Sequence, residues 1–158
     1  MPDKLLVAAR NFQSLAASVS EGRFVASEDV LKVIAIVRDH VPAEASPFPA
    51  YNEDHLLLIA GQFRRAFGAG DDRAARNFRT LLAGRPLQVT TIEHPAGGQD
   101  ACTVTLADPG NAGSGTSASG PTPACATLAA ALAFAAEDCV AAARAALARE
   151  EAAPAPGM

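Results

Sequence analysis

A glycine-rich segment is the first place in this chain where residue types and spacing could bind a phosphate. Residues 110–117 read Gly-Asn-Ala-Gly-Ser-Gly-Thr-Ser, and they have the glycine spacing of a Walker A loop, whose backbone N–H groups cradle phosphates. The position that needs a lysine for the β- and γ-phosphates is Thr116, and Pro121 and Pro123 delay the next predicted helix. Nucleotide or small-ligand binding at 110–117 is therefore a remote alternative.

The histidines and cysteines form no catalytic or metal-binding pattern. His94 and Cys102 are predicted on facing strands, but one histidine and one cysteine leave a metal site short of ligands, and CxxC and HxxxH spacings are absent. Cys125 and Cys139 are predicted on one helix about 21 Å apart, too far for a disulfide. We expect reduced thiols, no catalytic residue, no metal and no cofactor, and we predict that the protein is not an enzyme.

Arginine side chains gather in one stretch of an otherwise acidic chain. Residues 61–85 carry six arginines against two aspartates, for a net charge of +4, whereas residues 1–60 carry −3 and residues 86–158 carry −5. Arginine is well suited to binding phosphates and carboxylates; the alternative is a solvated helix face that pairs with the acidic flanks. The candidate nucleic-acid or partner-binding residues are Arg64, Arg65, Arg73, Arg76, Asn77, Arg79 and Arg85.

The elements that would position these residues begin with four helices. Apolar residues recur at helical spacing through the first half of the chain. Three prolines within residues 42–50 predict an extended connector between the second and third helices. The expected helices span about residues 4–19, 27–41, 52–67 and 71–83, with N-caps at Ser27, Asn52 and Asp71 or Gly70.

Beyond residue 86 the apolar period changes to two, which predicts a β-hairpin with strands at 87–94 and 101–107. A short third strand could follow at 116–119. Thr122 and Pro123 then predict the start of an Ala-rich helix that runs to about residue 150. The predicted fold class is α+β and mostly helical: four N-terminal helices, a β-hairpin and a long Ala-rich C-terminal helix.

Composition agrees with one globular domain. The chain has 158 residues, 37 of them alanine, no tryptophan and 49% hydrophobic residues, which excludes wholesale disorder and favours close-packed helices. We expect one domain over 1–151, with a helical half at 1–84, the hairpin and long helix at 85–151, and a disordered tail at 152–158. We see no secretory signal, and the apolar stretch 124–136 is shorter than the roughly 20 residues of a membrane span. The expected location is the cytoplasm, without a membrane partner.

The last helix also predicts self-association. Its apolar residues repeat at spacings of four and three, as in a coiled coil, and small side chains along this seam would let two backbones approach closely. One interpretation is a homodimer through the C-terminal helix; the other is a helix that packs across the hairpin and the N-terminal helices. The seam consists of Leu128, Leu132, Ala135, Cys139, Ala142 and Ala146.

Within residues 60–110 a helix, the turn Gly68-Ala-Gly70, an arginine-bearing helix and a hairpin follow one another. This order resembles that of winged helix-turn-helix regulators of the MarR type. The resemblance implies that Arg73, Arg76, Asn77 and Arg79 lie on a recognition helix and that a hairpin with its tip at 95–100 is the wing. It implies DNA as a partner.

Residues 87–150 are similar to small phage-encoded α-β-α sandwich domains, in which the final helix likewise opens with Thr-Pro-Ala, here Thr122 to Ala124. This resemblance implies a small accessory protein without catalysis. The function expected from the sequence is therefore that of a non-enzymatic bacterial or phage accessory protein that binds a protein partner of unknown identity. A winged-helix DNA-binding regulator that uses residues 61–85 is the alternative.

Overall fold

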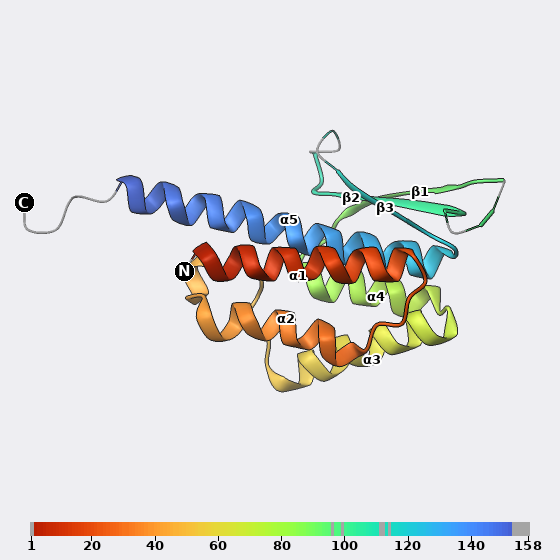
Figure 1. Cartoon of the computed structure of the whole chain (residues 1–158), viewed down its shortest axis with the longest axis horizontal. Helices are drawn as coiled ribbons and strands as arrows, with labels where there is room; N and C mark the ends of the chain where they lie inside the picture. Colours follow the sequence, from red (N-terminus) through yellow and green to blue (C-terminus); the bar gives the residue numbers. More distant parts are fainter. Residues whose placement is uncertain (1, 96, 99, 111–112, 114, 153–158) are drawn as a thin grey trace, which may run out of the picture.

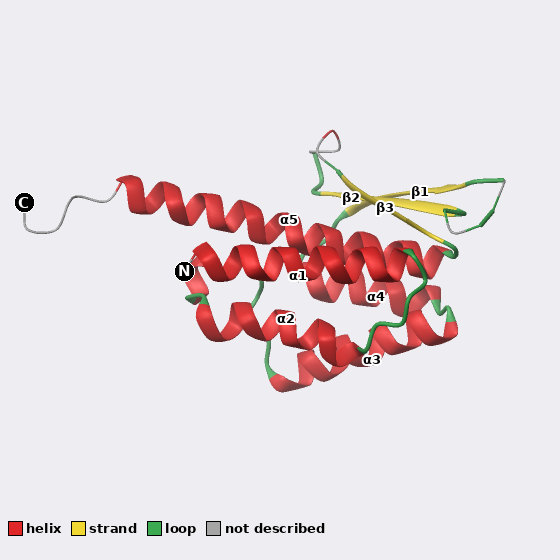
Figure 2. Ribbon diagram, viewed as in Figure 1, coloured by secondary structure: helices red, strands yellow, loops and turns green. Residues whose placement is uncertain are grey.

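The computed structural model describes residues 2–95, 97–98, 100–110, 113 and 115–152, and these form the mostly helical α+β fold that the sequence predicts. Figures 1 and 2 show the helices stacked in layers beneath a small sheet. In chain order the elements are α1 (Pro2–Ser20), α2 (Ser27–His40), the 3₁₀ turn η1 (Ala43–Ala45), α3 (Glu53–Ala69), α4 (Asp72–Ala83), β1 (Gln88–Glu93), β2 (Cys102–Ala107), β3 (Thr116–Gly120) and α5 (Pro123–Ala152).

The long helix α5 lies at the centre of this arrangement. It packs against α1 and α4 on one side and against β2 and β3 on the other. The helices α1 and α5 run side by side in opposite directions, and α2 and α3 form a layer farther from α5 (Figure 1). The sheet therefore touches the helical layers mainly through α5.

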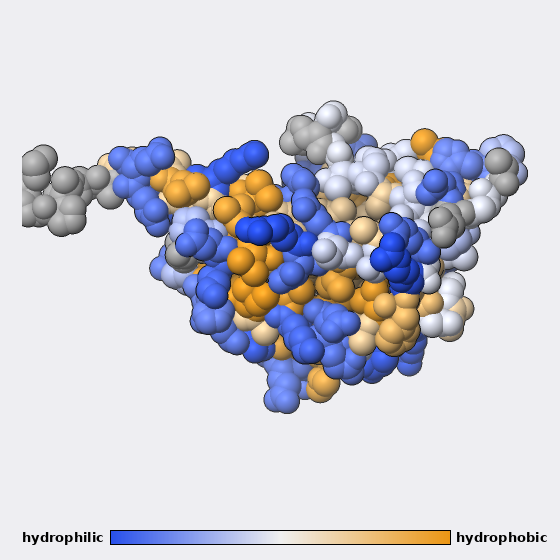
Figure 3. Space-filling model, viewed as in Figure 1, coloured by the Kyte–Doolittle hydropathy of each residue, from blue (hydrophilic) through white to orange (hydrophobic). Residues whose placement is uncertain are grey.

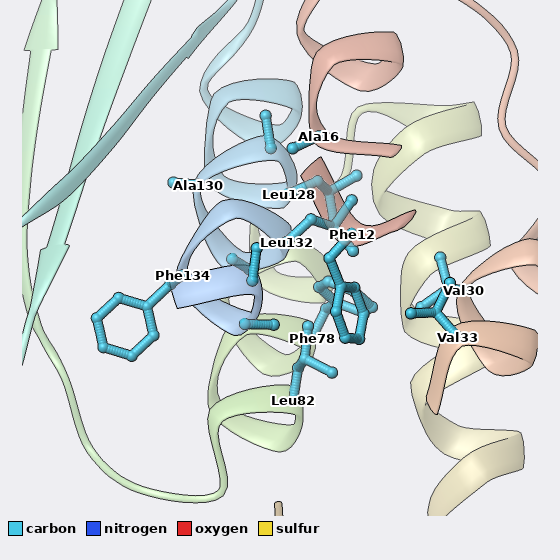
Figure 4. Close-up of a cluster of buried hydrophobic side chains, with 14 of the residues drawn as sticks. Phe12, Ala16, Val30, Val33, Phe78, Leu82, Leu128, Ala130, Leu132 and Phe134 are labelled. Carbon is cyan, nitrogen blue, oxygen red and sulfur yellow. The ribbon is translucent and has the colours of Figure 1, made fainter. Parts of the chain in front are cut away.

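Large side chains from three helices meet in the centre of the core. Leu128 and Leu132 of α5 point toward Phe12 of α1 and Phe78 of α4, whereas Phe134 points to the other side of α5 (Figure 4). All five side chains are buried. Most of the other buried positions on α5 are alanines, which allow neighbouring backbones to approach closely.

The seam that the sequence predicts for self-association lies inside the chain instead. Five of its six residues are buried in the core of this one chain, and Ala142 is half-buried. Because α5 is already covered by α1, α4 and the sheet, this seam does not offer a surface to a second copy. The alternative interpretation, a helix packed across the sheet and the N-terminal helices, is confirmed. The five buried residues are Leu128, Leu132, Ala135, Cys139 and Ala146.

The sheet is antiparallel with the order β1-β2-β3, so the short third strand is present. Glu93 pairs with Cys102 at the hairpin end, and Cys102 in turn pairs with Gly120 of β3. Side chains alternate between the two faces of a strand; accordingly Cys102, Val104 and Leu106 are buried on the face toward α5.

Hydroxyl groups cover much of the opposite face of β2 and β3. Thr103 and Ser119 lie across from each other with their side-chain oxygens 2.8 Å apart, and those of Thr105 and Ser117 are 2.6 Å apart. The sheet is accordingly pale, of intermediate hydropathy, in Figure 3, whereas apolar side chains gather over α1 and α5. The Ser20 hydroxyl, at the end of α1, also donates a hydrogen bond to the backbone carbonyl of Ser119.

Three of the predicted N-caps are confirmed, and one is wrong. Asn52, Asp71 and Thr122 each accept a hydrogen bond from the backbone N–H three residues later, as capping residues do. Ser27 is instead the first residue of α2 and follows the N-cap Ala26, which makes no side-chain cap bond. Helix α3 continues to residue 69, two residues beyond its predicted end, and the connector 42–50 contains the turn η1.

Helix α5 is long and apolar enough to cross a membrane. This corrects the expectation that the apolar stretch 124–136 is too short for a membrane span. An 18-residue window of α5 meets the criterion, but 72% of that window is buried inside the protein. The core helix of a water-soluble protein passes the same test, so the finding is weak evidence for a membrane span. Of the predicted tail 152–158, residues 153–158 lie outside the described residues, and Ala152 ends α5.

Two glycines that end helices allow a matched stability test. Gly70 and Gly84 both adopt left-handed backbone conformations, with φ of 67° and 69°. A Cβ at Gly70 would meet nothing within 4 Å, whereas a Cβ at Gly84 would lie 2.7 Å from Cδ of Pro49. We expect Gly70→Ala to lower the free energy of unfolding by about 1 kcal/mol and Gly84→Ala by at least about 1 kcal/mol more. Equal losses in urea unfolding would contradict this account.

Candidate functional site

An apolar hollow lies where the α1–α2 loop meets the end of α3 and the start of α5. It has a volume of about 650 Å³ and is open to solvent. We call it the Phe24 hollow. Its lining residues are Gly22, Phe24, Val25, Ala26, Ser27, Glu28, Phe63, Arg64, Phe67, Gly68, Pro121 and Cys125.

Phe24 is the outer member of a series of phenylalanines that leads into the core. The ring centroids of Phe24 and Phe67 are 6.5 Å apart, those of Phe67 and Phe63 are 5.6 Å apart, and those of Phe63 and Phe78 are 5.4 Å apart. Phe63 and Phe78 are buried and Phe67 is half-buried, but Phe24 is 85% exposed. The core therefore continues to the surface at this point and ends in an uncovered ring.

Sequence reasoning missed Phe24 because helical periodicity assigns it no buried position. It lies in the gap between α1 and α2, between Arg23 and Val25. A large aromatic residue in the short segment between two predicted helices is the signal by which it could have been recognised.

Arg64 supplies the positive charge at the rim of the hollow. Its Nη1 donates a hydrogen bond of 3.0 Å to Oγ of Ser27, a residue that is buried at the start of α2. This bond links α3 to α2, and the other N–H groups of Arg64 make no hydrogen bond with the described residues. Glu28 also lines the hollow, so the rim carries one charge of each sign among the described residues. Arg65, the next residue on α3, is exposed.

Arg85 has a different use from the one the sequence predicts, because it holds three parts of the chain together. Its Nε donates to Oδ1 of Asp108 at 2.7 Å, and Nη1 and Nη2 donate to the carboxylate of Asp138 at 3.0 Å each. The guanidinium also lies 5.1 Å from the centre of the Phe134 ring. Arg85 thereby links the end of α4, the end of β2 and the middle of α5, and it is not a free cation for a partner.

The surroundings of this network shift the pKa of each carboxyl group in a different direction. Burial raises the pKa of Asp138 above its usual value, although Arg85 pulls it down. The hydrogen bond from Arg85 lowers the pKa of Asp108, which is more exposed. The two aspartates together raise the pKa of Arg85, so the guanidinium stays charged at any accessible pH.

The remaining arginines of the predicted set lie on α4. Arg73 and Arg76 are exposed and Arg79 is half-buried. The neighbouring Asn77 donates a hydrogen bond of 3.2 Å to the side-chain oxygen of Gln62 on α3, so its amide connects two helices. The order α3, α4, hairpin agrees with a winged helix. DNA binding by these arginines stays a prediction.

The other candidate residues do not form a catalytic or metal-binding site within the described part of the chain. His94 points to the outer face of the sheet, where its Nε2 is 3.0 Å from Oγ1 of Thr103, whereas Cys102 is buried on the inner face. Within the described residues, no group of three or more His, Cys, Asp or Glu side chains could hold a metal ion. Residues 111, 112 and 114 of the glycine-rich segment lie outside the described part, and β3 stands where a phosphate loop needs a helix.

Comparisons of this chain with protein-family models, with curated proteins and with solved structures find no match. The resemblances to MarR-type regulators and to phage α-β-α domains therefore stay predictions. The class that the structure itself defines is a helical α+β protein built around one central helix.

The three thiols provide a test of the surface described above. Burial raises the pKa of Cys139 to about 12 and also raises that of Cys102, whereas Cys125 is half-buried and lines the Phe24 hollow. Because the thiolate is the reactive form, we expect one fast-reacting thiol in the folded protein with an aromatic disulfide reagent, and all three after unfolding. Cys125→Ser should remove the fast phase; a fast phase that survives this change would contradict the assignment.

Removal of Arg85 should destabilise the fold in a pH-dependent way. Arg85→Gln leaves the largely buried Asp138 carboxylate unpaired, which we expect to cost about 2 kcal/mol of unfolding free energy at pH 7. As the pH falls, Asp138 protonates first because its pKa is raised, and Asp108 later because its pKa is lowered. The cost should therefore shrink toward pH 3 in urea unfolding.

The matched control for this change is Arg65→Gln, which removes the same charge from an exposed side chain that makes no ion pair with the described residues. We expect it to change the unfolding free energy by less than about 0.5 kcal/mol. Equal effects of the two substitutions at pH 7 would contradict the role of Arg85.

Proposed function

We propose that this protein is not an enzyme and acts by binding another protein through the Phe24 hollow. The observation that carries the proposal is the 85% exposure of Phe24 beside an apolar hollow of about 650 Å³. Single exposed apolar residues are common on protein surfaces. An exposed aromatic ring that borders an apolar hollow and an arginine has the composition of a binding hot spot.

The lining of the hollow defines the partner segment. Val25, Phe63 and Phe67 offer an apolar surface that suits a bulky apolar side chain. Arg64 is held in place by Ser27 and makes no ion pair with the described residues, so it favours a carboxylate next to that apolar side chain. We therefore assign to the partner a leucine or aromatic anchor with an adjacent aspartate or glutamate.

The origin of the protein and its location in the cell are part of the same proposal. The expectation of a bacterial or phage accessory protein in the cytoplasm is supported by sequence patterns alone. The buried seam on α5 removes the support for a homodimer through that helix. The proposed partner at the Phe24 hollow is a different protein.

A peptide-display library selected on the unaltered protein tests this proposal. We expect enrichment of segments that combine a leucine or aromatic anchor with an acidic neighbour. Phe24→Ser should weaken their binding at least about tenfold, which corresponds to about 1.4 kcal/mol of lost contact. Leu147→Ser is the matched control, because Leu147 is a 44% exposed apolar residue on α5 outside the hollow; its effect should stay within about twofold.

The thiol of Cys125 reports on the same site. A bound peptide should slow its reaction with a thiol reagent, because Cys125 lines the hollow. Peptides that bind the Phe24→Ser variant as tightly as the unaltered protein, or leave the Cys125 rate unchanged, would place the docking site elsewhere. A library that enriches no peptide would contradict the proposed function.

A further inference from the structure

A second hollow lies on a different part of the surface, where β1 meets α4 and the start of α5. It has a volume of about 310 Å³. We call it the arginine groove, because two guanidinium-bearing side chains of α4 line it. Its lining residues are Asp72, Arg76, Arg79, Val89, Thr91, Pro123 and Thr127. None of them lines the Phe24 hollow.

The two arginines of this groove have no acidic partner in the part of the chain that the structure describes. Among the described residues, neither the guanidinium of Arg76 nor that of Arg79 takes part in an ion pair or a hydrogen bond. Arg85, only six residues beyond Arg79, is by contrast paired with two aspartates. The groove thus gathers two arginine charges that form no ion pair with any described acidic side chain, including Asp72 of the same groove.

The environment of Arg79 makes this arrangement costly for the chain alone. Partial burial lowers the pKa of Arg79, and the positive charge of Arg76 lowers it further. Both effects oppose the charged form of a side chain that stays charged at neutral pH. An anion between the two guanidinium groups would offset both effects. Anion binding is therefore more favourable at this groove than at an isolated surface arginine.

We propose that the arginine groove binds a phosphate group between Arg76 and Arg79. A guanidinium offers several N–H donors in a planar fork that matches phosphate oxygens. Thr91 and Thr127 line the same groove and provide hydroxyl groups as further donors. A tetrahedral phosphate has more acceptor oxygens than a carboxylate, so it can use more of the donors that line the groove on α4, β1 and α5.

The negative charge of Asp72 disfavours a bound phosphate, which provides a further test of the proposal. It lines the groove one turn before Arg76 on α4, but it forms no ion pair with either arginine. Its carboxylate repels a bound phosphate. Removal of this charge should therefore strengthen the binding of an anion, whereas removal of either arginine charge should weaken it.

Calorimetric titration with pyrophosphate at low ionic strength tests the proposal. We expect saturable binding by the unaltered protein, at least about tenfold weaker binding for Arg79→Gln and Arg76→Gln, and tighter binding for Asp72→Asn. Arg144→Gln is the matched control, since Arg144 is an exposed arginine farther along α5; its affinity should stay within about twofold. Because Arg79 is half-buried, thermal melting checks that its variant folds, and the exposed Arg76 provides the independent variant.

A second titration, with a short random-sequence duplex, distinguishes between two sources of the phosphate. Duplex binding that pyrophosphate displaces and that needs Arg76 would assign the groove to the backbone of a nucleic acid. Binding of pyrophosphate without binding of the duplex would assign it to a small phosphorylated compound. No saturable binding of pyrophosphate, or equal affinities of the Arg76→Gln and Arg144→Gln variants, would overturn the proposal.

Discussion

The close packing of α5 against its neighbours is the constraint on which the rest of the structure depends. Alanine side chains have no rotamer entropy to lose on burial, so a helix rich in buried alanine is ordered at low entropic cost. The same small side chains bring backbones near one another: a Cβ at Gly120 of β3 would lie 2.9 Å from the backbone nitrogen of Ala126. The sheet and the helical layers are thus both positioned by one helix.

Much of the fold could be predicted because its signals are local. Helix spacing, the alternation in β2 and the caps at Asn52, Asp71 and Thr122 each depend on residues within a few positions of one another. The seam on α5 could not be interpreted in this way. Its spacing fits either a second helix of the same chain or a second copy, and only the position of α1 decides between them.

The candidate site was less predictable because its residues meet across long stretches of sequence. Phe24 comes from the loop between α1 and α2, whereas Phe67 lies within α3. Arg85 finds its partners 23 and 53 residues further along the chain. The arginine cluster was visible as a local charge excess. Its division into a structural member, Arg85, and unpaired members, Arg76 and Arg79, follows from where distant aspartates lie.

The bond from Ser20 to the carbonyl of Ser119 has a consequence for how the sheet meets other chains. A strand at the edge of a sheet presents unpaired backbone groups that can template a further strand. At β3, one of these groups is taken by the end of α1. At β1, the other edge, the described ladder ends without such a contact, and the strand carries no lysine or proline to discourage pairing. The two borders of the sheet are therefore unequal, and strand addition is favoured on the β1 side.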